Sequence, residues 1–189
     1  MIEMRYENFN PKIHDVLKVA KLAYDVDFRT YNLLFKNPNK AIEAIAEDLR
    51  KNEIEYCFKI ILNDDDSIIG MLKTYTADTH FKFHFKAIRL IIVDILDHFV
   101  LCDIGDGDFY IAEIAIDECL RGQGMGRKVV LDTIEYAKSQ NYRRILLDVD
   151  FRNMGAKALY EKLGFRQFDK KSLKIGSFER GMYNMELIL

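Results

Sequence analysis

Apolar residues in the first part of the chain recur every three or four positions. Ile13, Leu17 and Ala20 follow this spacing and predict an amphipathic helix that ends near Tyr24. A second helix is predicted after Pro38, and the segment between the two helices is expected to be partly helical. The chain therefore begins with a helical region.

The next segments alternate between strand and helix patterns. Residues 56–62 and 68–75 are β-favouring runs on either side of a polar, turn-forming cluster, and they predict a β-hairpin. Residues 84–100 are apolar around most of a helical circumference, so a helix is expected that is buried in the core or at a subunit interface. Burial at a subunit interface would imply a homodimer, and this possibility stays open.

In the second half, a β-type run at residues 109–116 leads directly into a glycine-rich loop, residues 121–127. A helix with one apolar side follows the loop, and then a buried strand, a short helix and a β-rich C-terminus. These elements are predicted at residues 145–149, 156–163, 165–168 and 182–189, after the helix whose apolar side carries Val129, Val130, Thr133, Ile134 and Ala137. The order of elements is mixed α and β.

Composition excludes several classes of protein. The 189 residues, 49% hydrophobic and 31% charged, are typical of one ordinary globular domain. A net charge of −2 gives no general attraction to nucleic acid or to acidic membranes. Charged residues interrupt the apolar stretch 81–101, which argues against a membrane span, and the N-terminus lacks a secretory pattern. Three cysteines without metal-ligand spacing favour a reducing cytoplasm, with no metal site.

The glycine-rich loop carries the clearest chemical signal. A strand that enters Arg121-Gly122-Gln123-Gly124-Met125-Gly126-Arg127 and continues as a helix gathers unpartnered backbone N–H groups around one point. The helix dipole adds partial positive charge, and glycine lets a phosphate approach closely. The loop therefore predicts an anion site suited to a pyrophosphate, although such loops also occur for packing alone.

Two linked motifs resemble those of the GNAT superfamily of N-acetyltransferases. The first is Ile114-Ala115-Ile116 followed by Arg121, Gly124 and Gly126, which is similar to the family's strand and acetyl-CoA signature. The second runs from Asn153 through Ala156 and Tyr160 to Gly164-Phe165. The sequence departs from the family at Glu118, where proline is common, but this change removes no loop amide.

The resemblance implies a fold and a donor. The expected fold is α/β (α+β), the GNAT acyl-CoA N-acyltransferase fold, with a central, mixed, mostly antiparallel sheet of about six to seven strands flanked by helices. It implies one domain over residues 1–189, with an acetyl-CoA-binding core at about 108–168. The loop amides would hold the CoA pyrophosphate, Asn153 would bond the CoA arm, and backbone groups of Ile114 and Ile116 would pair with the pantetheine.

Acyl transfer to an amine needs a neutral nucleophile, a polarised carbonyl and a proton for the departing thiolate. The resemblance assigns the proton donor to Tyr160; the alternative is a core tyrosine whose hydroxyl is hydrogen-bonded. Asp148 and Glu113 both correspond to positions where family members keep an acidic base, and the choice between them stays open. For each, a solvated or salt-bridged strand residue is the competing interpretation.

Other candidates carry weaker signals. His80, His84 and His98 are too loosely spaced for a metal site, and Cys119 has no recognised partner for a nucleophilic role. Direct transfer in a ternary complex is therefore preferred.

The acceptor is a primary amine, either a small molecule or a protein amino group, and the sequence does not choose between them. Acidic residues could form a cleft for a cationic acceptor, whereas aromatic residues near the N-terminus could receive a peptide. The alternative function is a non-catalytic acyl-CoA sensor or interaction module on the same fold. The acidic residues are Asp25, Asp27, Glu113, Asp148 and Asp150, and the aromatic ones are Tyr24, Phe28 and Tyr31.

Overall fold

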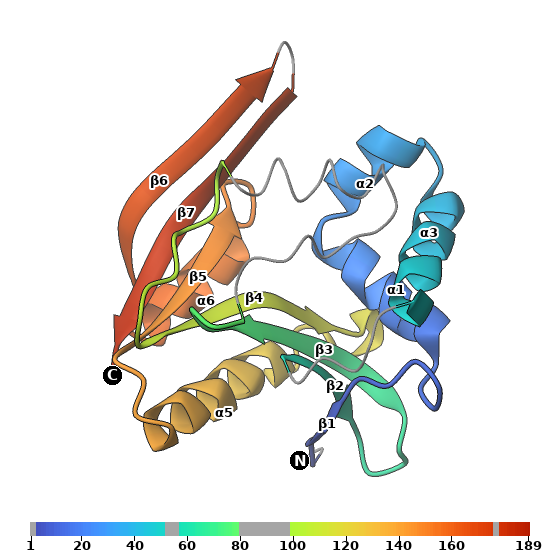
Figure 1. Ribbon diagram of the computed structural model, residues 1–189, viewed down its shortest axis with the longest axis horizontal. Helices are drawn as coiled ribbons and strands as arrows, with labels where there is room; N and C mark the ends of the chain where they lie inside the picture. Colours follow the sequence, from blue (N-terminus) through green and yellow to red (C-terminus); the bar gives the residue numbers. More distant parts are fainter. Residues whose placement is uncertain (1–2, 52–56, 80–98, 176–177) are drawn as a thin grey trace. The chain divides into compact units, whose positions relative to one another are not determined.

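The computed structural model describes residues 3–51, 57–79, 99–175 and 178–189 (Figure 1). Contacts between α-carbons divide these residues into two compact units. One unit comprises residues 3–74 and 113–126, and the other comprises residues 75–79, 99–112 and 127–189. The predicted helix at 84–100 lies outside the described residues except at its end, and the prediction of a single domain stays a prediction.

The first unit contains three helices at the start of the chain, α1 (Val16–Val26), α2 (Phe28–Phe35) and α3 (Pro38–Lys51). Asp15 begins α1, where its carboxylate accepts hydrogen bonds from the backbone N–H groups of Leu17 and Lys18, both at 3.0 Å. The three helices pack on one another (Figure 1), and Val19, Ala20, Ala41 and Ile45 on them are almost fully buried. The predicted helix near Tyr24 and the helix after Pro38 are confirmed.

The same unit contains the strands β1 (Arg5–Asn8), β2 (Phe58–Leu62) and β3 (Ile68–Tyr75, except its last residue). β2 and β3 form the predicted hairpin, and β1 pairs antiparallel with β2 from Arg5↔Leu62 to Asn8↔Lys59. Sequence analysis missed β1, because four residues of mixed burial have no clear alternation.

The second unit contains α5 (Met125–Ser139, from Arg127 onward), β5 (Arg144–Asp150), α6 (Met154–Lys162), β6 (Arg166–Ile175) and β7 (Phe178–Ile188). The predicted apolar side of α5 is buried: Val129, Val130, Thr133, Ile134 and Ala137 all have exposures of 7% or less. The C-terminal strands are longer than predicted and form an extended hairpin (Figure 1). Residues 169–172 of the first strand are all polar, so the sequence lacks the apolar alternation that would have predicted its full length.

The seven strands follow the order β1-β2-β3-β4-β5-β7-β6, where β4 is Asp108–Ile116. β4 and β5 pair in parallel from Asp108↔Arg144 to Ile111↔Leu147, while β5 with β7 and β6 with β7 are antiparallel. This mixed, mostly antiparallel sheet confirms the predicted fold class. Among the described residues, none of the helices is both long and apolar enough to cross a membrane.

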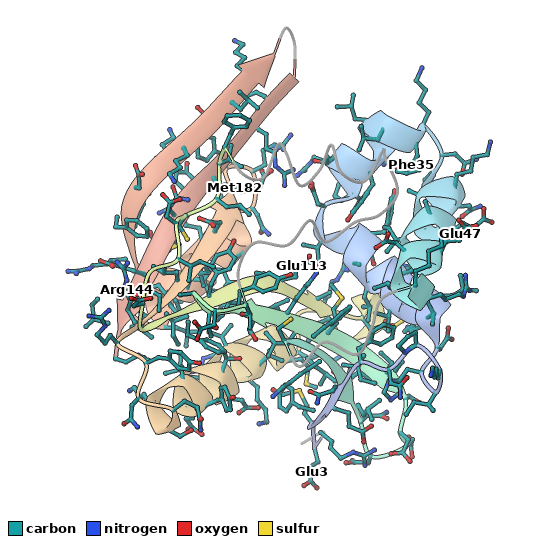
Figure 2. The ribbon with its side chains drawn as sticks, viewed as in Figure 1. Glu3, Phe35, Glu47, Glu113, Arg144 and Met182 are labelled. Atoms are coloured by element: carbon teal, nitrogen blue, oxygen red, sulfur yellow. The ribbon has the colours of Figure 1, made fainter. Side chains whose placement is uncertain are left out.

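A buried ion-pair network lies where β4, β5 and β7 meet in the second unit. Arg144 (Figure 2) donates to both oxygens of Asp108, at 2.7 and 2.9 Å, and to Glu186 at 3.0 Å. Asp108 and Glu186 are only 3% and 8% exposed. Burial opposes ionisation of Asp108, but the bonds from Arg144 and from the Gly105 N–H outweigh it and lower the pKa of this carboxyl.

Replacing Arg144 tests this network. Arg144→Leu should lower the free energy of unfolding by about 3 kcal/mol. This value is the lower end of the range for breaking a buried ion pair, and we choose it because Arg144 itself is partly exposed. Urea denaturation measures this change. Arg152→Leu, which removes a more exposed pair with Asp150, should cost under about 1 kcal/mol. Equal losses in the two variants would contradict the assignment of the network as buried.

Candidate functional site

The loop between β4 and α5 has the open geometry that an anion site requires. Gly122 and Gly124 have φ angles of +78° and +80°, in the left-handed region that favours glycine. A Cβ atom at Gly122, Gly124 or Gly126 would meet nothing within 4 Å. In the part of the chain that the structure describes, the backbone N–H groups of residues 122–127 donate to no protein acceptor. The predicted amides are therefore available to a ligand.

Side chains hold this loop in place from the protein side. The Arg121 guanidinium donates to the Ile116 carbonyl at 3.1 Å and to the Asp25 carboxylate at 3.3 Å. The Gln123 amide donates to the Cys119 carbonyl at 3.1 Å. Sequence analysis placed both residues in the loop but did not foresee that their side chains would brace it.

An ion pair from α1 fixes the turn before the loop. Lys18 bonds to Asp117, whose other oxygen accepts from the Cys119 N–H at 2.9 Å and whose own N–H donates to the Ile69 carbonyl at 2.8 Å. The hydrogen bond from Lys18, followed by that from Cys119, lowers the pKa of Asp117 to about 2. Asp117 is thus a fixed negative charge that joins α1, β3 and the turn.

Tyr160 lies on α6 in the second unit and is partly buried. Its ring packs edge-on against Phe165, with centroids 5.6 Å apart. Burial raises the pKa of its phenol to about 12, so the hydroxyl stays protonated at neutral pH. No hydrogen bond joins this hydroxyl to any of the described residues.

Asn153 begins the helix that carries Tyr160. Its side-chain oxygen accepts from the Ala156 N–H at 3.2 Å, as predicted for an N-cap. The residue is exposed. The cap is a structural role and leaves the predicted bond to CoA untested.

Glu113 lies on β4 in the first unit (Figure 2) and is half-buried. Burial raises the pKa of its carboxyl; Lys73 opposes this shift and Asp27 adds to it. A carboxylate with a raised pKa is a stronger base than an ordinary glutamate.

Asp148 has a different environment in the second unit. Its carboxylate accepts from the Cys102 N–H at 3.0 Å, from the Tyr110 hydroxyl at 2.9 Å and from the Asn184 side-chain amide. Burial raises the pKa of Asp148 against these three hydrogen bonds. Sequence analysis missed the partners; the only signal was a lone asparagine in the apolar run of the last strand.

The remaining candidates lie as follows. Asp25 bonds to Lys21 and Arg121, and Asp150 bonds to Arg152, so both acids are paired. Tyr31 is 5% exposed and the Tyr24 hydroxyl donates to Asn32, whereas Phe28 is 42% exposed. Cys119 is exposed, and the three histidines His80, His84 and His98 lie outside the described residues. Among the described residues, no cluster of histidine, cysteine and acidic side chains could hold a metal ion.

Comparison with known proteins supplies independent findings. The sequence profile of the acetyltransferase (GNAT) family matches residues 23–165. An uncharacterised N-acetyltransferase of Methanocaldococcus jannaschii is 40% identical over 57 residues, 30% of this chain and 25% of that protein. A mycothiol acetyltransferase of Acidothermus cellulolyticus is 36% identical over 75 residues, 40% of this chain and 21% of that protein. The matches thus span a quarter or less of these relatives' length.

A solved structure has a similar fold over nearly the whole chain. It is a chimeric spermidine N-acetyltransferase from Vibrio cholerae and hSSAT, with a TM-score of 0.64 and 14% identity. The alignment covers 98% of this chain and 95% of the other. At this identity the likeness concerns the fold alone.

The Lys18–Asp117 pair should contribute stability that depends on pH. The pKa of Asp117 is about 2 when folded and about 3.9 in an unfolded chain, so its contribution is complete above about pH 5 and is lost as pH falls towards 2. Lys18→Met should lower the free energy of unfolding by about 1 kcal/mol at pH 7, a small value because Lys18 is partly exposed. The loss should become progressively smaller below about pH 5. Thermal unfolding from pH 7 to pH 2 measures this; a penalty that grew in acid would contradict it.

Proposed function

Since the chain belongs to the acetyltransferase (GNAT) family, we propose that it transfers an acetyl group from acetyl-CoA to a primary amine, directly and in a ternary complex. The observation that carries the proposal is the loop of residues 122–127, whose backbone amides are open while the side chains of Arg121 and Gln123 are bonded to the protein. Such a loop at the start of a helix binds phosphate groups. The pyrophosphate of CoA is the ligand that this arrangement suits.

In this proposal, donor binding is divided among three groups of residues. The amides of residues 122–127 take the pyrophosphate, with Arg121 and Gln123 bracing them through bonds to Ile116 and Cys119. The backbone of Ile114, Ala115 and Ile116 takes the pantetheine arm as an added strand. Asn153 contributes its free amide nitrogen to the same arm.

Two side chains handle the protons. Glu113 accepts a proton from the ammonium form of the acceptor, directly or through water, because burial makes its carboxylate more basic. The neutral amine nitrogen then forms a bond to the acetyl carbon and the carbon–sulfur bond breaks. Tyr160 donates its phenolic proton to the departing sulfur, a role that its protonated state and its hydroxyl, unbonded to described residues, both support. The nitrogen gives up its second proton to water, from which the Tyr160 phenolate regains the proton that it donates.

The acceptor is proposed only as a class. Glu113 and Asp27 lie in the same unit and influence each other electrostatically, so negative charge gathers near the proposed base. This favours an acceptor that arrives as a cation, whether a small amine or a protein amino group. The proposal places the reaction in the cytoplasm, where acetyl-CoA and reduced cysteines occur together.

Binding of CoA tests the loop. Gly124→Glu should weaken CoA binding at least about 30-fold, because a carboxylate would both block and repel the pyrophosphate. Gly124→Ala is the matched control, since it shares the backbone strain at φ +80° but adds no charge. Isothermal titration calorimetry measures both affinities. If the two variants bind CoA alike, charge at this position does not matter and the loop assignment fails.

Catalysis tests Tyr160. Tyr160→Phe keeps the ring that packs on Phe165 and should lower kcat about 100-fold, within the usual range for general acid catalysis, with little change in KM for acetyl-CoA. Release of CoA with a panel of polyamines, aminoglycosides and short peptides measures the rate. An unchanged kcat in a variant that still binds CoA would show that another group protonates the sulfur.

A further inference from the structure

The carboxylate of Asp148 joins four segments of the second unit. Oδ2 accepts from the Cys102 N–H and the Tyr110 hydroxyl, and Oδ1 accepts from the Asn184 side chain. Asn184 also donates to the Val100 carbonyl at 3.1 Å. Through one side chain, β5 is thus connected to β4, to β7 and to the segment that contains Val100 and Cys102.

These atoms lie at a particular place in the sheet. The parallel register of β4 and β5 ends at Ile111↔Leu147, and Asp148 is the next residue of β5. Tyr110, which reaches Asp148, is the residue before the last pair on β4. A side-chain hydrogen bond therefore connects the two strands next to the end of their parallel backbone pairing.

The contacts of Asp148 are poorly suited to a base. A carboxylate has about four lone-pair sites. Three of them accept the hydrogen bonds above, and the Cys102 thiol also hydrogen-bonds to this carboxylate. Val100, Tyr110 and Asn184 are 4% exposed or less, so they are closed to solvent. A general base must instead direct an open lone pair at the acceptor's proton.

We propose that Asp148 is a positioning residue that pins β4 and residues 100–102 to β5 and β7, and so keeps β4 in the conformation that receives the pantetheine arm. This rests on the proposed function, in which the residues of β4 beyond the β4–β5 register bind that arm. Glu113, and not Asp148, is then the residue that acts on the acceptor's proton.

Three variants weaken the hydrogen bonds of Asp148 to different extents. Tyr110→Phe deletes one hydroxyl and should weaken CoA binding about 3-fold. Asp148→Ala deletes the carboxylate and should weaken CoA binding about 10-fold, with hydrogen exchange at the Cys102 amide faster by about 10-fold or more. Asp148→Asn keeps an oxygen for Cys102 and Tyr110 but loses the acceptor for the Asn184 amide, so CoA binding should weaken less than in Asp148→Ala and exchange at the Cys102 amide should stay within about 3-fold of wild type.

The same set includes controls and a comparison for the base. Tyr142→Phe removes a hydroxyl from a tyrosine of the same unit that packs on Phe109, outside the pin, and should leave CoA affinity unchanged. Tyr110→Phe should weaken CoA binding no further in the Asp148→Ala background, since the bond between Tyr110 and Asp148 is already absent there. The pH profile of acetyl transfer should keep its ascending limb in Asp148→Asn and lose it in Glu113→Gln.

Each failure has its own signature. A loss of more than about 100-fold in acetyl transfer by Asp148→Asn, with the Cys102 amide still protected, would identify Asp148 as the base and overturn the proposal. If hydrogen exchange at the Cys102 amide is unchanged in Asp148→Ala, Asp148 does not hold residues 100–102 in place, and the proposed positioning role is overturned. Absence of CoA binding by the wild-type protein would instead overturn the proposed function, because the exchange measurement does not depend on CoA.

Discussion

The proposed activity depends on one constraint: the loop before α5 must be held by the protein without the use of its own amides. A helix start leaves several N–H groups without helical partners, and a protein normally satisfies them with nearby side chains. Here the side chains of Arg121 and Gln123 bond to backbone carbonyls, and Asp117 caps the preceding turn. The amides of residues 122–127 remain for an anion, which is then stabilised by the helix dipole as well.

The four carboxyl groups differ in pKa because they differ in burial and in hydrogen-bond partners, and they therefore suit different roles. Asp117 and Asp108 have lowered pKa values because cations bond to them, and they serve as fixed charges. Glu113 and Asp148 both have raised pKa values because of burial. The Asp148 carboxylate also accepts hydrogen bonds from Cys102, Tyr110 and Asn184, which is why we propose Glu113 as the proton acceptor and Asp148 as a positioning residue.

α6 contributes the other half of the proposed chemistry. Asn153 fixes the start of this short helix, and Phe165 packs against the ring of Tyr160, so the phenol is oriented by packing and not by a bond to its hydroxyl among the described residues. A protonated hydroxyl that no described residue engages can respond to a ligand. The same geometry would also suit a protein that binds acyl-CoA without turnover, and the rate of transfer separates these functions.

The sequence by itself determined the elements whose signal is local. Periodicity located α1, α3, the β2–β3 hairpin and the buried side of α5, and motif spacing located the loop, Asn153 and Tyr160. Only the tertiary structure decided how Arg121 is used, which strand β1 pairs with and what surrounds Asp148. These facts depend on residues that are far apart in the chain, such as Cys102, Asp148 and Asn184, and a hydrogen bond between distant residues leaves no periodic trace in either segment.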